Sequence, residues 1–221
     1  ICEKDSTTIS ASGGNKYLWS NGSTNSSQKV APSSTTQYTV TVTNVEGCTS
    51  SDKILITVRS LPNADIIGNK PICVGESLTL EVLLVNNNQY KWSSGSNTNK
   101  AIVTPNQTTT YSVSITDNVG CTNLSSVQVV VNPLPIVNLG QDTIKTQIGK
   151  SATLDAGSGQ TNYLWSNGSS ASTIVVNEPS ANYCVTVTNL FGCKASDCVY
   201  VKFINTGLDE LNDWGIKLFP N

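Results

Sequence analysis

The residues of this chain with the clearest capacity for covalent chemistry are its seven cysteines. Cys48, Cys121 and Cys193 each follow a glycine at matching points of a repeated motif, and Cys2 and Cys73 form a second matching set. Cysteines that recur at fixed places in small, strand-rich units are typical of disulfides formed in an oxidising compartment. A zinc site is not favoured, because no close pair of cysteines faces another such pair and the sequence has no histidine.

The recurrence of both kinds of cysteine within the first two units predicts two bridges inside units, Cys2–Cys48 and Cys73–Cys121. The third unit has Gln147 in place of the first member. A geometric objection stays open. The two members would lie at opposite ends of a simple sandwich, whereas a bridge needs Cα atoms within about 7 Å of each other.

The third unit carries two further cysteines, Cys184 and Cys198, on two strands that we expect to form a hairpin. Both side chains should point outward on the same face, so we predict a cross-strand Cys184–Cys198 bridge. Cys193 is then left over. It is either a free, inert thiol or one half of a bridge to something outside this chain.

Other chemistry finds little support in the sequence. Without histidine there is no Ser-His or Cys-His pair, and the carboxylates differ between units and form no repeated calcium loop. We interpret them as solvated loop residues, although sequence alone leaves paired glycosidase carboxylates open. The glycines follow turns and not phosphate-binding spacings. We therefore expect no enzymatic activity, no cofactor and no metal.

The overall composition argues against two classes of partner. The formal net charge is −2, whereas nucleic acid would require a basic face. No apolar run approaches the ~20 residues that span a bilayer, so we expect neither nucleic-acid binding nor membrane insertion.

The elements that position the cysteines repeat along the chain. A Tyr-x-Trp-Ser-x-Gly-Ser motif occurs at residues 17–23, 90–96 and 163–169, with a period of about 73 residues. A second motif, Tyr followed by alternating Val or Ile and Thr or Ser and ending at Gly-Cys, keeps the same spacing. A fixed period of this kind indicates an array of like modules.

Each module is expected to be a β-sandwich. Alternation of apolar and polar residues, as in Tyr38–Val42 and Tyr183–Val187, is typical of half-buried antiparallel strands. About seven short strands per module, separated by Asn/Gly/Ser clusters, predict two packed sheets. The tryptophan of the motif belongs on an inner strand between the sheets. The alternative is that Trp19, Trp92 and Trp165 are exposed and stack on sugars.

Leu-Pro steps at Leu61-Pro62 and Leu134-Pro135 predict short, stiff linkers. We therefore expect an all-β chain of three tandem immunoglobulin-like β-sandwich domains in an extended array. The predicted domains are 1–60, 61–132 and 133–203, and residues 204–221 form a linker and the start of another module. The first domain is N-terminally incomplete, because Ile1-Cys2 aligns with Ile72-Cys73.

The repeats resemble the immunoglobulin-like, or PKD-like, repeats of secreted surface proteins of Bacteroidetes. The likeness is carried by the run Cys73–Leu80, by Trp92 and by the run Thr109–Cys121, and it covers roughly residues 1–203. The repeats lack the acidic Trp-Asp-x-Gly-Asp-Gly stretch of PKD modules. The final run Gly215–Asn221 resembles the first strand of the C-terminal sorting domain that the type IX secretion system reads.

This resemblance implies export through the outer membrane, followed by display on the cell or release. It implies a structural or adhesive stalk segment of a large surface protein, such as an adhesin or a fibre component. The partners implied are other domains of the same chain, neighbouring copies, surface glycans and the secretion machinery. The short motifs Asp5-Ser6-Thr7 and Asp142-Thr143-Ile144 make Ser6 and Thr143 candidates for O-glycosylation.

The alternative is a non-catalytic C-terminal accessory region of a secreted hydrolase, possibly binding carbohydrate. That interpretation places the catalytic domain before Ile1 and predicts exposed, coplanar aromatic side chains. The stalk interpretation predicts more repeats before Ile1 and buried tryptophans.

Overall fold

The computed structural model describes residues 1–205, and the regular elements of this part are eighteen strands, β1 to β18. The β-branched and aromatic residues of the alternating motifs form these strands, since such side chains pack well on a pleated sheet. Within these residues the structure has no helix of the length and apolar character that a membrane span needs. The all-β prediction is confirmed.

The described chain forms two compact units, and the division between them runs through the second repeat. The first unit comprises residues 1–69, 78–103 and 110–128, and the second comprises 70–77, 104–109 and 129 onward. The three predicted domain boundaries stay a prediction. The tail prediction for 206–221 lies outside the described residues.

The first unit begins with a sandwich made by the first repeat. One sheet pairs β1 (Thr7–Ser10) with β3 (Ser27–Val30), and the other has the order β2-β4-β5 (Lys16–Trp19, Thr36–Thr43, Thr49–Ile56). Both sheets are antiparallel. The inner side chains of both sheets form one core: Ile9, Trp19, Val30, Tyr38, Val40 and Ile56.

The second repeat supplies the remaining strands of the first unit. β7 (Leu78–Glu81) pairs with β9 (Lys100–Val103), and a second sheet has the order β11-β10-β8 (Thr122–Val129, Thr109–Thr116, Gln89–Trp92). Ile67, which lies in the linker before these strands, forms an isolated antiparallel bridge with Glu81 on β7.

The second unit contains a short parallel pair and the third sandwich. The pair joins β6 (Ile72–Cys73) to β12 (Val131–Asn132). The larger sheet of the sandwich has the order β13-β18-β17-β15 (Thr143–Gln147, Lys194–Ile204, Ala181–Thr188, Asn162–Trp165), and the smaller one pairs β14 (Ala152–Asp155) with β16 (Thr173–Val176).

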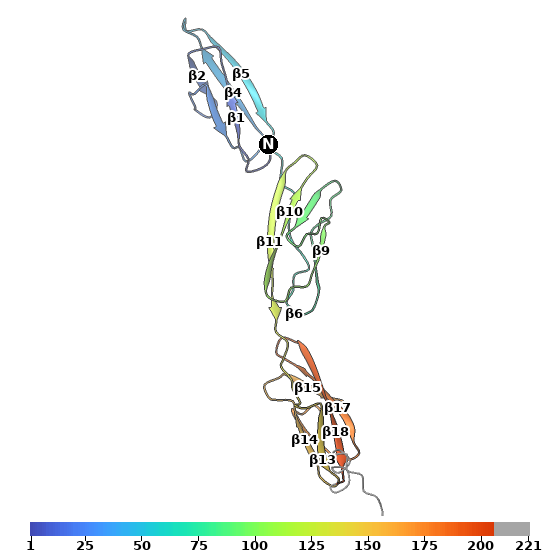
Figure 1. Ribbon diagram of the computed structural model, residues 1–221. Coiled ribbons are helices and arrows are strands. Elements are labelled where there is room, and N and C mark those ends of the chain that lie inside the picture. The colour runs from blue at the N-terminus through green and yellow to red at the C-terminus, as the bar shows by residue number, and fades with distance from the viewer. Residues whose placement is uncertain (206–221) are drawn as a thin grey trace, which may run out of the picture. The chain divides into compact units, whose positions relative to one another are not determined.

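The strand order of the third sandwich is that of an immunoglobulin-like fold, with one sheet built on the C, F and G strands and the other on B and E. β13 adds to the larger sheet by running parallel to β18. The grouping of strands is visible in Figure 1. Among the described residues the three repeats hold five, seven and six strands, so the expectation of about seven is met by the second repeat alone.

The tryptophans lie between the sheets, as the sequence predicted. Trp19, Trp92 and Trp165 are 4%, 2% and 2% exposed. Each indole N–H donates to a backbone carbonyl six residues further along, at 2.8–2.9 Å. The burial removes a large apolar surface from water, and the hydrogen bond satisfies the one polar group that burial would leave unpaired.

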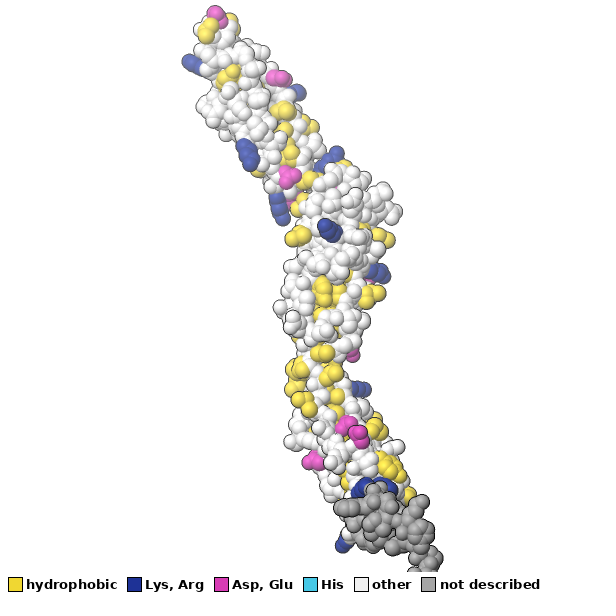
Figure 2. Space-filling view, in the orientation of Figure 1, with side chains coloured by type: hydrophobic (Ala, Val, Ile, Leu, Met, Phe, Trp, Pro, Cys, Tyr) yellow, Lys and Arg dark blue, Asp and Glu magenta, His cyan; other side chains and the backbone are white. Residues whose placement is uncertain are grey.

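The visible surface carries few charges. Figure 2 shows lysine, arginine and acidic side chains scattered singly over a face that is otherwise polar and uncharged, with small apolar spots. This agrees with a chain of which 13% of residues are charged. On the face that Figure 2 shows, lysine and arginine side chains do not gather into a basic patch.

Candidate functional site: disulfides between successive repeats

The cysteines join successive repeats. Cys2 of the first repeat bonds to Cys121 of the second, and the Cα atoms are 5.5 Å apart. Cys73 of the second repeat bonds to Cys193 of the third, with a Cα separation of 5.6 Å. The two bridges span 119 and 120 residues. The first cysteine of each repeat therefore pairs with the second cysteine of the repeat that follows.

The predicted pairs Cys2–Cys48 and Cys73–Cys121 are wrong, and the reason is geometric. Cys2 lies beside Arg59, just past the end of β5. Cys48 lies just before the start of β5 at Thr49. Ten residues of extended chain separate these two places by about 30 Å at ~3.3 Å per residue, far beyond the ~7 Å that a bridge allows.

Both expectations for Cys193 are also wrong, because it is bonded within this chain to Cys73. The cysteine that the structure leaves free is Cys48, and it is exposed. The sequence signal was present in the matching positions of Cys48, Cys121 and Cys193. Matching positions alone do not say whether the partner lies in the same repeat or in the next one.

The Cys184–Cys198 bridge is present, as predicted. The two residues are direct cross-strand partners on β17 and β18. Thr39 and Lys53 occupy the same register on β4 and β5 of the first repeat. This bridge closes a hairpin inside one repeat and joins no modules.

The second cysteine of every repeat has the same local structure. It follows a glycine with positive φ, at 85° in Gly47, 90° in Gly120 and 82° in Gly192. An Asn or Asp four residues earlier accepts the cysteine N–H: Asn44 for Cys48, Asp117 for Cys121 and Asn189 for Cys193, at 2.8–3.0 Å. The turn between the last two strands is therefore built in the same way whether or not its cysteine is bonded.

The first cysteine lies in a matching turn of its own. The N–H of Cys2 donates to Asp5 and that of Cys73 donates to Glu76, each three residues ahead. Gln147, which replaces this cysteine in the third repeat, sits in the corresponding register beside Ile204. The third repeat thus keeps the backbone position and lacks the thiol.

Side chains close to the bonded cysteines also bind the linkers. In the second unit the Asn189 side-chain amide donates to the Pro133 carbonyl at 2.8 Å. In the first unit Asn123 makes a bond of the same length to the Pro62 carbonyl. Cys121 and Cys193 are each 1% exposed. The bridges are therefore backed by packing and hydrogen bonds.

The structure contradicts sugar stacking by the repeated tryptophans, since all three indoles are buried in the sandwich cores. Titratable groups do not converge either. Residues 1–205 contain no group of three or more His, Cys, Asp or Glu side chains that could hold a metal, and none of their polar or charged residues is buried.

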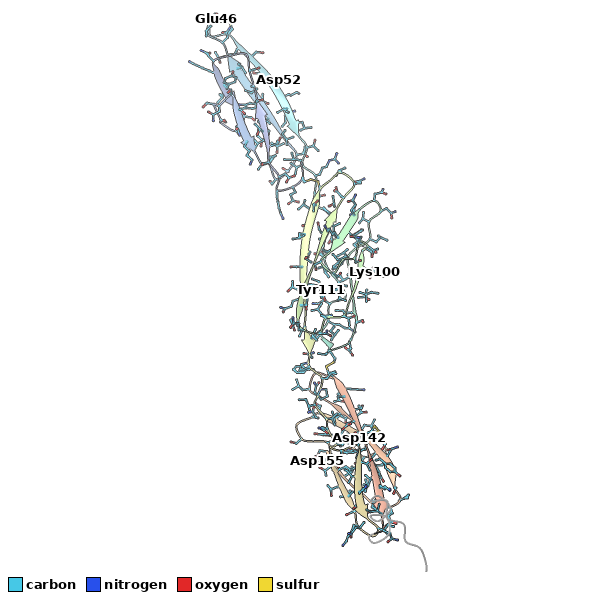
Figure 3. All side chains as sticks on the ribbon, viewed as in Figure 1. Glu46, Asp52, Lys100, Tyr111, Asp142 and Asp155 are labelled. Atoms are coloured by element: carbon cyan, nitrogen blue, oxygen red, sulfur yellow. A yellow bond between two sulfur atoms is a disulfide. The ribbon has the colours of Figure 1, made fainter. Side chains whose placement is uncertain are left out.

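The one salt bridge found within residues 1–205 joins Lys100 to Glu81 at 3.3 Å, with the lysine side chain 56% exposed. Figure 3 places Lys100 at the surface of the second repeat. An exposed pair of this kind contributes little to stability.

The two candidate glycosylation residues are both accessible. Ser6 precedes β1 and is exposed, and Thr143 opens β13 and is exposed. Exposure is a precondition for modification, and the modification itself stays a prediction.

No protein-family model and no curated protein matches this chain. Solved structures that match this chain include an I-band fragment of titin, at 11% identity and a TM-score of 0.38, covering 92% of this chain and 94% of that one. Another is the three N-terminal domains of the bacteriophage RB49 highly immunogenic outer capsid protein, at 11% identity and a TM-score of 0.39, covering 93% and 96%. The insect immune protein hemolin matches at 11% identity and a TM-score of 0.36, covering 92% and 72%.

At these values the comparisons add nothing to what the strand order shows. The strand order itself defines the class, a tandem array of immunoglobulin-like β-sandwiches. The disulfides define the particular kind of array, one in which each repeat is covalently tied to the next. Such an array is consistent with a structural or adhesive role, and three disulfides are consistent with an extracellular location.

Proposed function

We propose that this chain is a structural or adhesive stalk segment of a large secreted cell-surface protein, an adhesin or a fibre component, exported by type IX secretion. The observation that supports it most is the pair of disulfides that tie each repeat to its successor. The run Gly215–Asn221 supports the export route by its resemblance to a sorting domain. The expected partners are other domains of the parent chain, neighbouring copies, surface glycans and the secretion machinery.

The bridges suit a load-bearing role. Each closes a loop of more than 100 residues, and loop closure of that size stabilises a fold by about 5 kcal/mol on the chain-entropy argument. That is comparable to the net stability of a small β-sandwich with a modest core. Two modules that share a bridge also cannot separate when one of them opens.

Pulling on single molecules tests this role. With both bridges intact, the shortest covalent route from residue 1 to residue 221 passes through the Cys2–Cys121 disulfide and follows the backbone from residue 121 back to residue 73. It then passes through the Cys73–Cys193 disulfide and follows the backbone to the end of the chain. That route holds roughly 80 residues and extends to about 280 Å, whereas the fully reduced chain extends to about 780 Å. We expect the short contour without reductant and the long one with it.

The control is the double variant Cys2→Ser/Cys73→Ser, which should give a contour close to the long value without reductant. A long contour for the untreated protein would contradict the covalently tied array.

Surface location is tested separately, by proteinase treatment of intact source cells followed by blotting with antibody to residues 1–205. We expect loss of the band, and a protected band would refute surface display.

The alternative, an accessory region of a secreted hydrolase, differs in what the parent protein carries before Ile1. Its carbohydrate-binding form loses its main support, because the repeated tryptophans are core residues. Reading the parent gene separates the two. Further repeats upstream support the stalk, and a catalytic domain supports the accessory region.

A further inference from the structure

The first repeat has an open groove at its free cysteine. The groove has a volume of about 630 Å³ and a mixed lining, with apolar residues such as Val42 and Ile54 beside polar ones such as Asp52, and it includes Cys48. Ile54 is 45% exposed, whereas its counterpart in the third repeat, Val199, is 1% exposed. The same strand position is therefore exposed to solvent in the first repeat and buried in the third.

In the third repeat the corresponding place is filled by the linker that precedes the module. Leu139 is 9% exposed and belongs to the core, and Val137 packs against that core. The Leu139 N–H donates to a carboxylate oxygen of Asp197 at 2.6 Å. The linker is thus an integral part of the sandwich.

The linker of the second repeat plays the same part within the first unit. Ile67 and Glu81 exchange two backbone hydrogen bonds, at 2.8 and 3.1 Å, and Ala64 is 4% exposed. Gly68 runs so close to β7 that an added Cβ would lie 2.6 Å from the Thr79 carbonyl. In the first repeat, Ser10 on β1 takes the place of Glu81, and β1 has β3 as its strand partner within the described residues.

A polar group in the groove matches one that binds the linker in the third repeat. Asp52 and Asp197 hold the same register on their strands, opposite Val40 and Val185. One oxygen of each accepts the N–H of the next residue, at 2.7 and 2.9 Å. The other oxygen of Asp197 binds the linker, and that of Asp52, labelled in Figure 3 on β5, has no partner within residues 1–205.

Asn44 and Cys48 complete the match. The Asn44 side-chain oxygen accepts the Cys48 N–H, as that of Asn189 accepts the Cys193 N–H. The amide of Asn189 also donates to the linker carbonyl of Pro133, and Cys193 is bonded to the preceding repeat. The third repeat thus contacts the chain that precedes it through an asparagine, a cysteine and an aspartate. The first repeat has the same three residue types in the same order.

We propose that the groove of the first repeat, with Asn44, Cys48 and Asp52, receives a further module of the same kind that precedes Ile1 in the parent polypeptide. Its linker lies along β1 and fills the groove. Its first cysteine, the counterpart of Cys2 and Cys73, bonds to Cys48. Both sibling junctions have a disulfide to the preceding repeat and a buried linker residue, Ala64 in one and Leu139 in the other. The asparagine and aspartate contacts are those of the third repeat, and the bridge along the outer strand is that of the second.

The bond forms by oxidation of two thiols. Cys48 and the arriving cysteine each lose a proton, their sulfurs join, and two electrons pass to a disulfide oxidant. With oxidised glutathione as the oxidant, its S–S bond is cleaved, and its two sulfurs take up the electrons and protons as thiols. This inference agrees with the stalk interpretation, which expects further repeats before Ile1, but it is argued from the groove and its test does not depend on the proposed export route.

The test is a chain in which a second copy of residues 62–145 is fused ahead of Ile1 and oxidised with glutathione. Non-reducing peptide mapping should then show the copied Cys73 bonded to Cys48, and alkylation of Cys48 should fall at least tenfold relative to the unmodified chain. A Cys48 that stays fully reactive in the folded fusion would overturn the proposal.

Groove filling is tested on the same fusion carrying Cys48→Ser. Amide exchange around Ser10 and Ile54 should slow at least tenfold relative to the unmodified chain. Ile54→Asp should abolish this protection, whereas Leu55→Asp, on the opposite face of β5 and 57% exposed, should leave it unchanged. Equal effects of the two substitutions would contradict a specific groove.

If the added copy fails to fold, residues 133–145 alone are fused ahead of Ile1. This shorter fusion needs no additional module and should give the same slowing of exchange around Ser10 and Ile54. Unchanged exchange there would overturn the proposed occupancy.

Discussion

The first and third repeats share one fold and differ in what completes it. In the third repeat, Leu139 lies in the core, Asp197 binds the linker backbone and Cys193 is bonded and buried. In the first repeat, Asp52 corresponds to Asp197 and Cys48 corresponds to Cys193. Both are exposed, and the cysteine is free. The difference shows that the preceding segment contributes core packing, a hydrogen bond and a disulfide to a module, in addition to what the module's own strands supply.

The comparison also explains how a small sandwich with few charges remains stable. The linker adds apolar area to the core, the turn side chains bind the linker carbonyl, and the disulfide prevents the segment from leaving. Each contribution can be removed separately by one substitution, and a matched substitution at a position that lacks the contact serves as the control.

Removing a junction bridge should have the largest effect. We expect Cys73→Ser to lower the free energy of unfolding of the second unit by about 4–5 kcal/mol, because a loop of 120 residues is no longer closed. Cys48→Ser should change stability by less than about 0.5 kcal/mol, since an exposed free thiol closes no loop. Hydrogen exchange followed by mass spectrometry measures both variants strand by strand, and equal effects would refute the comparison.

Truncating the linker side chain should come next. Leu139→Ala should cost about 3 kcal/mol, in the range measured for leucine truncation in a core, and should speed exchange in β17 and β18. Ile136→Ala, in the same linker but 89% exposed, should cost less than about 0.5 kcal/mol. If the two substitutions prove equivalent, the linker is not part of the core.

Neutralising the linker-binding carboxylate should have the smallest effect. Asp197→Asn should cost about 1.5 kcal/mol, as expected for a hydrogen bond that involves a charged group. Asp52→Asn should be neutral within about 0.5 kcal/mol, because its second oxygen binds nothing within residues 1–205. Urea unfolding monitored by exchange in each repeat measures the difference, and a larger loss at Asp52 would reverse the assignment.

The fold could be predicted from sequence because its signals are local. Alternation at Tyr38–Val42 and Tyr183–Val187 placed the strands, and the repeated tryptophan placed the core. Register alone also sufficed for Cys184 and Cys198, since both lie on one hairpin.

The junction bridges could not be predicted in this way. Equivalent positions in successive repeats show that two cysteines recur, but not whether the partner belongs to the same repeat or the next one. That choice depends on which ends of neighbouring modules meet. The one sequence-based signal for the correct pairing is that Cys2 and Cys48 would lie at opposite ends of a single sandwich.

The central claim is that the first cysteine of each repeat bonds to the second cysteine of the following repeat. Peptide mapping of the alkylated protein under non-reducing conditions tests it most directly. We predict linked peptides for Cys2–Cys121, Cys73–Cys193 and Cys184–Cys198, with alkylated Cys48 as the one free thiol. Linked peptides for Cys2–Cys48 or Cys73–Cys121 would contradict the account.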